Sequence, residues 1–475
     1  MKEEKGITVK KEKDMPEWYS QVCLKSGLAD YGPVKGTMII KPLGYAVWEK
    51  IQNYFNDILK KRKVQNAYYP MFIPESFFKK EAEHAKRFSP EVAWLESKNK
   101  SEERLAIRPT SETIIYDAYA KWIRSWRDLP LKTNQWCNIV RWEVSDCKLF
   151  LRSREFLWQE GHCAYETEEE CEKENSEILD DYEKLCKNLL ALPLLKGEKT
   201  EKEKFAGAKK TNTVEAFMPD GKALQCGTVH NLGQNFAKSF NINYLDKNEK
   251  IQIPWQSSWG ISTRLIGAAV MTHSDDKGLI LPPAIAPTEI VIIPILFKGK
   301  ETEKILKKAK EIKNKLKSFE AELDDRTEYS PGWKFAEYEM KGIPIRLELG
   351  PNDLKKNQVI LVRRDKNEKK EIKISQLKEK IKFELEDMQK CLYEKAKKFL
   401  DSSIKKANNW NEFLNIIKNK QIALAPFCGD IECEDCIKEK SGGASSRLIA
   451  DKKTKGKCVY CNKPSNLLVY FSKSY

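Results

Sequence analysis

Apolar residues along the first part of the chain follow first helical and then strand spacing. After Pro42, which suits the first turn of a helix, they recur every three or four residues, at Leu43, Val47, Ile51, Tyr54, Phe55 and Ile58. This pattern predicts a helix. The next apolar segment, residues 67–73, has the length of a strand. Because Pro70 lies inside it, we expect an edge position or an interruption there.

Two longer segments, residues 136–144 and 150–165, predict a pair of antiparallel strands around a short polar turn at Ser145 and Asp146. If the second strand keeps its period of two without a bulge, one of its faces carries Arg152, Arg154, Phe156, Trp158, Glu160 and His162. That mixture suggests a site for an anionic group beside a small amphipathic one. A solvent-exposed face of ion pairs is the alternative, and the residue types alone do not decide between them.

The second half of the chain alternates strands with helices. Several prolines punctuate residues 282–294, and Ile290–Ile293 then predicts a buried strand. A helix follows, with apolar residues at Ile305, Ala309, Ile312, Leu316 and Phe319. Strands are expected at 343–349 and 359–363, before a long helix through residues 377–399. This alternation indicates a small α/β domain, so we expect an α+β protein divided at residues 1–287, 288–400 and 401–475.

Composition narrows the class of protein. The chain has 475 residues, 41% of them hydrophobic, which excludes global disorder. Its longest strongly apolar stretch, residues 290–297, is too short to cross a bilayer, and the charged N-terminus lacks the apolar core of a signal peptide. We therefore expect a soluble, cytoplasmic protein without membrane contact. The net charge is +15, and residues 297–420 hold 32 basic and 22 acidic side chains, which favours a polyanionic partner.

Cysteines indicate a metal site rather than a disulfide framework. Of the 13, five cluster near the C-terminus, at Cys428, Cys433, Cys436, Cys458 and Cys461. Four thiolates would form a closed, structural zinc site. Generic ribbon spacing selects Cys433, Cys436, Cys458 and Cys461. There is no Walker P-loop and no dinucleotide glycine fingerprint, so any phosphate binding would depend on arginines.

At this point several motifs match a known family. Arg141-Trp-Glu143 together with residues 150–162 resembles the second signature motif of class II aminoacyl-tRNA synthetases, in the form found in the prolyl enzymes. The helix from Pro42 with the strand around Pro70 resembles the first motif, and residues 258–267 resemble the third. Thr263 stands where the general class has an acidic residue, a departure that the prolyl branch tolerates. Further matches are residues 108–112, 225–236, 331–335 and 342–353, and the resemblance extends from Trp18 to Tyr475.

The resemblance implies activation of L-proline by ATP and transfer to tRNA(Pro), with Mg²⁺ bound to the ATP and with Arg141 and Arg264 as the catalytic residues. Arg141 would hold the carboxylate and the α-phosphate, Arg152 and Arg264 the γ-phosphate end, and Glu143 the adenine. The implied ATP site comprises Arg141, Glu143, Arg152, Ser153, Gln225, Thr228 and Arg264. The implied proline site comprises Thr110, Glu112, Arg141, Trp158, Glu160, His162, His230 and Ser262.

The remaining implications concern partners and the chain ends. The family's first motif lies at a dimer interface, which implies a homodimer. For the anticodon the resemblance points to Glu339, Arg346 and Asp353, and for zinc to Cys428, Cys433, Cys458 and Cys461. Only 89 residues, 166–254, separate the second and third motifs, so we expect the archaeal or eukaryote-like type without an editing insertion. The terminal Tyr475 would fold back toward the catalytic domain. The competing hypothesis is a non-catalytic RNA-binding paralogue.

Overall fold

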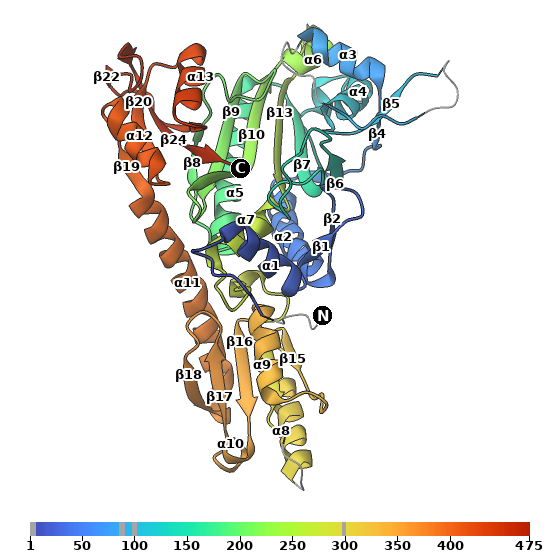
Figure 1. Ribbon diagram of the computed structural model, residues 1–475. Helices are drawn as coiled ribbons and strands as arrows, with labels where there is room; N and C mark the ends of the chain where they lie inside the picture. The colour runs from blue at the N-terminus through green and yellow to red at the C-terminus, as the bar shows by residue number, and fades with distance from the viewer. Residues whose placement is uncertain (1–5, 85–90, 97–101, 297–300) are drawn as a thin grey trace.

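The computed structural model describes residues 6–84, 91–96, 102–296 and 301–475. Its main feature is a mixed sheet that carries strands from both ends of the chain (Figure 1). In spatial order the strands are β19 (Ile404–Lys406), β20 (Ile422–Phe427), β24 (Leu467–Ser474), β21 (Ser445–Asp451), β8 (Leu195–Glu198), β9 (Lys210–Phe217), β10 (Lys222–Gly233), β13 (Trp255–Ser262), β7 (Glu155–Tyr165), β6 (Leu131–Val140) and β3 (Gln65–Asn66).

Helices cover the central strands and enclose the largest apolar core. They are α1 (Met15–Lys25), α2 (Pro42–Lys61), α5 (Glu168–Asn188) and α7 (Arg264–His273). The predicted helix from Pro42 is confirmed as α2, with the proline in its first turn. The first residues of α5 are held by a capping box between Thr167 and Glu170, and three glutamates occupy its first turn, where negative charge favours the helix dipole.

The predicted antiparallel pairing is confirmed, because β6 and β7 are paired from Leu131–Ala164 to Val140–Glu155. The first strand is shifted from the predicted 136–144, and residues 141–154 connect the two strands where a short turn at Ser145 and Asp146 was expected. The predicted face is only partly correct. β7 begins at Glu155, so Arg152 and Arg154 precede the strand. The backbone groups of Lys148 and Arg152 bond to each other, and Phe150 has a positive φ of 60°, so the chain turns tightly before the strand starts.

Other short elements lie around this core. The apolar segment 67–73 is interrupted, as its proline indicated: β3 ends before it at Asn66, residues 67–71 belong to no strand, and β4 (Phe72–Pro74) begins near its end. β4 pairs with β5 (Leu105–Ile107), beside α3 (Glu75–His84), α4 (Glu112–Trp122) and α6 (Asn235–Ser239). Two small ribbons are formed by β1 (Ala29–Tyr31) with β2 (Met38–Ile40) and by β11 (Tyr244–Leu245) with β12 (Ile251–Gln252).

A second sheet forms the lower part of the molecule in Figure 1. It orders β15 (Ala321–Leu323), β14 (Ile290–Pro294), β16 (Ile345–Leu349), β17 (Gln358–Arg363) and β18 (Lys369–Lys373), and it packs against α8 (Glu301–Lys315), α9 (Pro331–Met340) and α10 (Pro351–Lys355). The expected strands and helices of an α/β unit are confirmed here. The long helix α11 (Leu377–Ser403) then runs upward along one side (Figure 1). Residue 400, which we took as a domain boundary, lies inside that helix.

The C-terminal residues pack α12 (Trp410–Lys418) and α13 (Ile431–Lys440) against β20, β21 and β24, with β22 (Gly456–Lys457) and β23 (Pro464–Ser465) as a small ribbon. These strands continue the mixed sheet described first. β21 meets β8 at Ile449–Glu198, and the end of β24 runs parallel to the start of β10. The sequence pattern did not indicate this continuity, because cross-strand pairing between segments about 250 residues apart leaves no local periodicity.

Candidate active site and metal centre

A cavity of about 380 Å³ lies over β7, β10 and β13. These adjacent strands place Trp158 opposite Ser262 and Thr228 opposite Gly260, so residues far apart in sequence share one surface. From the residues that the sequence analysis selected, the cavity is lined by Thr110, Glu112, Arg141, Glu143, Trp158, Glu160, His162, Gln225, Thr228, His230, Ser262 and Arg264. Arg152 and Ser153 do not line it. Ser153 donates instead to the backbone oxygen of Glu155, at 2.8 Å.

Two carboxylates occupy one end of the cavity. Glu112 begins α4 and accepts a hydrogen bond from Thr110, and its burial raises its pKa above the ordinary value. Glu160 accepts bonds from Ser111, from Gln135 at 2.9 Å and from His162 at 3.2 Å. Burial alone would raise the pKa of Glu160, but these donors bring it below its ordinary value. This end of the cavity therefore suits a cationic amine.

The sequence analysis missed the residues that hold these groups. Tyr116 contacts Nδ1 of His162 at 3.1 Å from α4, and Gln135 reaches Glu160 from β6. Both are fully buried polar side chains. Two signals in the sequence could have found them. Tyr116 lies one helical turn after Glu112, and Gln135 pairs with Glu160 across β6 and β7.

Two guanidinium groups also line the cavity, and the charges of Glu112 and Glu160 act on Arg141. Arg264 begins α7 and donates to the backbone oxygens of Leu151 at 3.1 Å and Gln225 at 3.2 Å. Arg141 lies near the rings of Phe156 and Trp158. Burial lowers the pKa of Arg141, and burial together with the charge of Arg141 lowers the pKa of Arg264 to about 10.

Neither guanidinium forms an ion pair with any carboxylate in the described parts of the chain. Buried charges in proteins are normally paired, because an isolated ion loses its hydration without compensation. Two unpaired arginines facing one cavity are therefore the electrostatic pattern of an anion site. Arg152 adds to it, since its charge also acts on Arg264 from outside the cavity.

His230 also forms part of the cavity wall. Its Nδ1 lies 3.0 Å from the hydroxyl of Thr211, and its ring packs on Phe205 with centroids 4.6 Å apart. Burial, followed by the charges of His162 and Lys199, lowers the pKa of His230 to about 3, so this ring is neutral at neutral pH. Phe205, with Glu203 and Ala206, belongs to a loop between β8 and β9 that the sequence analysis did not connect with the site.

The C-terminal residue contacts the catalytic domain. The backbone N–H of Tyr475 donates to the oxygen of Ala223 at 3.2 Å, and its hydroxyl donates to Asp220 at 2.6 Å. The ammonium groups of Lys148 and Lys222 each lie 5.2 Å from the centre of its ring. Lys148 belongs to the turn just before Arg152, so the chain end lies against the segment that leads into β7.

The residues selected for the anticodon lie on the second sheet and its helices, Arg346 on β16, Glu339 on α9 and Asp353 on α10. Arg346 on β16 is buried and bonds Glu339 at 3.2 Å and Glu348 at 3.0 Å, with its guanidinium 4.3 Å above the ring of Phe335. Asp353 accepts a bond from the backbone N–H of Gly350 at 2.9 Å and so caps the short helix α10. Arg346 and Glu339 are thus brought together, whereas Asp353 serves its own helix.

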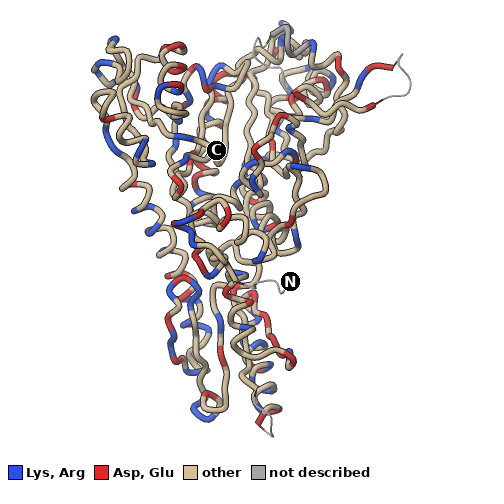
Figure 2. The backbone as a smooth tube through the Cα atoms, in the orientation of Figure 1, with Lys and Arg blue, Asp and Glu red and all other residues tan. Residues whose placement is uncertain are grey.

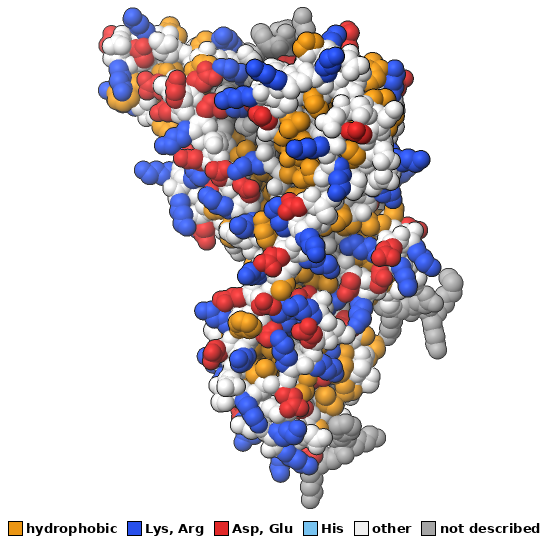
Figure 3. All heavy atoms as spheres, turned by 90° about the vertical axis from the view of Figure 1, so that its left-hand side faces the viewer, with side chains coloured by type: hydrophobic (Ala, Val, Ile, Leu, Met, Phe, Trp, Pro, Cys, Tyr) orange, Lys and Arg blue, Asp and Glu red, His pale blue; other side chains and the backbone are white. Residues whose placement is uncertain are grey.

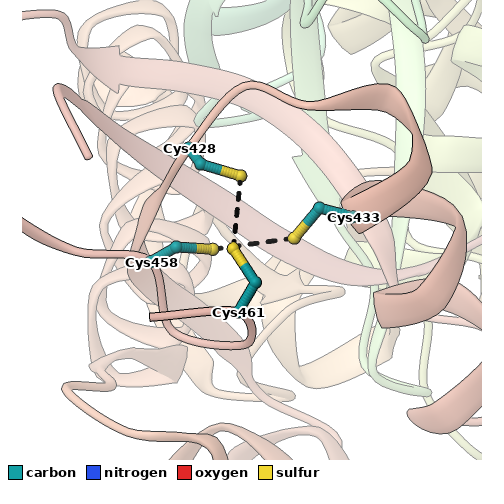
Figure 4. Close-up of side chains that lie close together, drawn as sticks. All are labelled: Cys428, Cys433, Cys458 and Cys461. Carbon is teal, nitrogen blue, oxygen red and sulfur yellow. Dashed lines mark hydrogen bonds between the residues drawn. The ribbon is translucent and has the colours of Figure 1, made fainter. Parts of the chain in front are cut away.

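Four cysteine sulfurs meet in the C-terminal domain. Cys428, Cys433, Cys458 and Cys461 point toward one another (Figure 4), with their sulfurs all within 4.8 Å, and Cys436 lies outside the group. The Cys433–Cys458 and Cys428–Cys461 sulfur distances are both 3.7 Å. A tetrahedral zinc site with Zn–S bonds of about 2.3 Å requires sulfurs about 3.8 Å apart. The donor set and its spacing therefore fit a structural zinc ion.

Local structure explains how these four cysteines converge. Gly429 has a φ of +86°, which turns the chain sharply after Cys428, and Asp430 caps the helix α13 that carries Cys433. Cys458 and Cys461 lie in one tight turn, in which Asn462 donates to the oxygen of Cys458 at 3.1 Å. Cys436 is one helical turn beyond Cys433 on α13 and is half-buried, outside the group of four.

Three family models match the chain. They are the tRNA synthetase class II core domain (G, H, P, S and T) over residues 94–273, the anticodon binding domain over residues 289–384, and the prolyl-tRNA synthetase C-terminal domain over residues 410–475. Together with the antiparallel sheet and its arginine-lined cavity, these matches define a class II aminoacyl-tRNA synthetase.

Proline–tRNA ligases of other organisms match this protein over nearly the whole chain. A proline–tRNA ligase of Alkaliphilus oremlandii is 48% identical over 98% of this chain and 97% of its own length. A proline–tRNA ligase 2 of Bacillus cereus is 46% identical over 100% of both. A crystal structure of prolyl-tRNA synthetase from Cryptosporidium parvum, complexed with halofuginone and AMPPNP, has a TM-score of 0.93 and 42% identity, and covers 99% of this chain and 97% of its own.

The chain belongs to the prolyl-tRNA synthetase family. Its C-terminal domain is typical of the archaeal and eukaryote-like type, as expected from the sequence. No helix in the described residues is long and apolar enough to cross a membrane.

Proposed function

We propose that this protein activates L-proline with ATP to form prolyl-adenylate and diphosphate, and then transfers proline to the 3′ end of tRNA(Pro). The observation that carries this proposal is one cavity lined by two buried carboxylates and by two buried guanidinium groups that form no ion pair in the described residues. Proline and ATP need that combination, since one brings a cationic amine and the other a polyanion.

Activation joins two anions, the carboxylate of proline and the α-phosphate of ATP. Arg141 lies between the carboxylates and Arg264, and its planar guanidinium can donate to both reacting groups at once. Arg264, with Arg152 behind it, would bind the far end of the triphosphate, and Glu143 would accept from the adenine amino group. Catalysis then comes from orientation and from stabilising the charge that develops at phosphorus. No residue needs to form a covalent intermediate.

At the other end Glu112, with Thr110 bonded to it, would accept from the ring amine of proline. Trp158 and the neutral ring of His230 supply flat walls for the pyrrolidine, and Glu160 holds His162 in place. Ser258, which also lines the cavity, has a buried hydroxyl without a hydrogen-bond partner in the described residues, as expected of a group that meets a ligand.

Magnesium would accompany ATP and offset its charge. The described residues contain no cluster of three or more metal-binding side chains apart from the four cysteines, so the ion would be held chiefly by the triphosphate. Zinc is assigned to Cys428, Cys433, Cys458 and Cys461, where its role would be to hold the C-terminal fold together.

Proline-dependent exchange between ATP and labelled diphosphate tests the proposal. We expect exchange in the natural protein and a fall of about 100-fold or more in Arg141→Ala and Arg264→Ala, as for other groups that stabilise transition-state charge. Arg127→Ala, which changes an exposed arginine outside the cavity, is the matched control. A non-catalytic RNA-binding paralogue would bind tRNA but show no exchange at all.

The proposed tRNA partner is supported by charge. Basic residues occur along α11 and throughout the lower domain, with acidic residues between them (Figure 2). Figure 3 views the molecule from the side along which α11 runs, and basic side chains are spread over that face among acidic ones. Arg346 and Glu339 are the residues we propose for the anticodon, together with Asp353. Affinity for tRNA(Pro) should fall steeply with salt. Arg346→Ala should weaken tRNA binding without changing proline-dependent exchange.

A homodimer and the absence of editing complete the proposal. β1, β2 and the start of α2 expose Tyr31, Val34, Ile39 and Tyr45, an apolar surface that a second copy would cover. Sedimentation should therefore give twice the mass of 55.1 kDa.

Residues 166–254 are used by α5, α6 and β8 to β12, which leaves no separate domain for hydrolysis. Purified protein should not hydrolyse alanyl-tRNA(Pro). The cytoplasm, where protein synthesis uses this reaction, is the proposed location.

A further inference from the structure

A buried arginine from the C-terminal domain reaches the catalytic domain beside the cavity. Arg447 lies on β21 at a bulge, where the register with β24 shifts between Ser446 and Leu448. A bulge redirects the side chain of its extra residue. Here the guanidinium crosses to β9, where it bonds both carboxylate oxygens of Glu215 at 2.9 and 3.1 Å.

Glu215 also has a cationic partner from its own domain. Lys199, which follows β8, donates to it at 2.6 Å, and all three side chains are buried. Burial alone would raise the pKa of Glu215, but the two cations keep it below its ordinary value, so the carboxylate is ionised. Lys199 and Arg447 thus place two cations on this one carboxylate, and the charge of Glu203 also acts on Lys199.

This cluster lies beside residues that line the cavity. Glu215 pairs with Gln225 across β9 and β10, and directly opposed side chains share one face of a sheet. The backbone oxygen of Gln225 accepts the bond from Arg264, and the charge of Glu215 acts on Arg264. Arg447 is therefore connected to the arginine of the proposed ATP site through one carboxylate and one strand pair.

A second contact joins the same two domains nearby. Ser446, next to Arg447, donates to Glu434 on α13 at 2.5 Å and lies 2.9 Å from the hydroxyl of Thr200. Thr200 begins the loop whose Glu203 and Phe205 line the cavity. Since Glu434 is adjacent to Cys433, the helix that carries a cysteine of the metal centre also holds one end of this loop.

We propose that Arg447 is a positioning residue for ATP, through which the zinc-bearing C-terminal domain completes the catalytic site. This proposal rests on the function proposed above. Arg447 fixes Glu215, and with it the Gln225 backbone that holds Arg264. Without Arg447 the cavity should still form, but it should bind ATP more weakly.

The test is Arg447→Met in proline-dependent ATP–diphosphate exchange. Methionine keeps the length of the side chain and leaves Glu215 neutralised by Lys199, so no buried charge is left unpaired. We expect the KM for ATP to rise by about tenfold, the equivalent of about 1.4 kcal/mol, while the rate at saturating ATP changes by less than about threefold, as when ground-state binding is lost. The zinc content should stay at one ion per chain.

Arg364→Met is the matched control. Arg364 is also buried, and it also joins two domains, because it bonds Asp275 of the catalytic domain at 2.6 and 2.9 Å from the second sheet. It has no contact with the cavity wall. Its removal should lower the melting temperature and leave the KM for ATP unchanged.

If Arg447→Met lowers the melting temperature but leaves the KM for ATP within twofold, the contact is only structural and the proposal is wrong. If that variant does not fold, Arg447→Lys tests the proposal instead. Lysine keeps the positive charge but cannot bond both carboxylate oxygens of Glu215 as the guanidinium does. A KM raised more than twofold then supports the proposal, and an unchanged KM refutes it. Absence of exchange in the natural protein would refute the proposed function instead.

Discussion

Zinc binding gives the sharpest test of the metal centre, because one cysteine of five should be dispensable. Cys428→Ser removes a sulfur of the four that converge, and Cys436→Ser removes the neighbouring sulfur that lies outside the group. Structural zinc contributes about 10–16 kcal/mol in small zinc-binding peptides. One quarter of that is about 3 kcal/mol, so the loss of one thiolate should weaken binding by about two orders of magnitude.

Zinc retention can be measured by dialysis against increasing concentrations of a chelator, followed by elemental analysis. The unmodified protein and Cys436→Ser should keep one zinc per chain, and Cys428→Ser should lose it at a chelator concentration about 100-fold lower. Two of the ligating cysteines, Cys433 and Cys458, belong to the buried core of the C-terminal domain, so loss of zinc should also lower its melting temperature. Equal retention by both variants, or loss only from Cys436→Ser, would refute our assignment of the ligands.

Three further predictions concern the catalytic domain. The kcat/KM for proline should fall as the pH drops through the raised pKa of Glu112, above the ordinary 4.5, because the protonated acid cannot accept from the cationic amine; this acidic limb should be absent in Glu112→Gln. Removing the last two residues, including Tyr475, should slow proline-dependent exchange while the melting temperature changes by only a few degrees, and a parallel loss of both would contradict a role in the site. Gly161→Ala would place a Cβ 2.2 Å from the buried ring of Trp259 and should destabilise the protein by about 1–3 kcal/mol in thermal unfolding. Gly332→Ala, which meets nothing within 4 Å, is its control, and equal stability of the two variants would show that the ring has room to move.

Local pattern was sufficient for much of the fold. The helix from Pro42, the hairpin of β6 and β7 and the strands and helices of the second sheet follow from apolar periodicity, because each buries one face against a neighbour. Periodicity could not place Arg152 and Arg154, since the turn before β7 depends on a backbone bridge between Lys148 and Arg152.

The sequence predicted most of the residues that line the site, but not the residues that hold them in place. Motif resemblance selected Arg141, Glu160 and His230, which do meet in one cavity. It could not select Phe205 or Arg447, because their roles arise from contacts between segments far apart in sequence. Likewise the five clustered cysteines indicated a metal site, but spacing alone favoured Cys436, and only the sharp turn after Cys428 makes the observed grouping possible.

The sheet that crosses from the catalytic strands into the C-terminal strands has a practical consequence for shortened forms of the protein. A chain that stopped after α11 would lack β21 and β24, and would leave β8 and the start of β10 as open edges with free backbone donors and acceptors. Open edges recruit strands from other molecules. Such a fragment should precipitate or form mispaired oligomers rather than behave as a smaller enzyme.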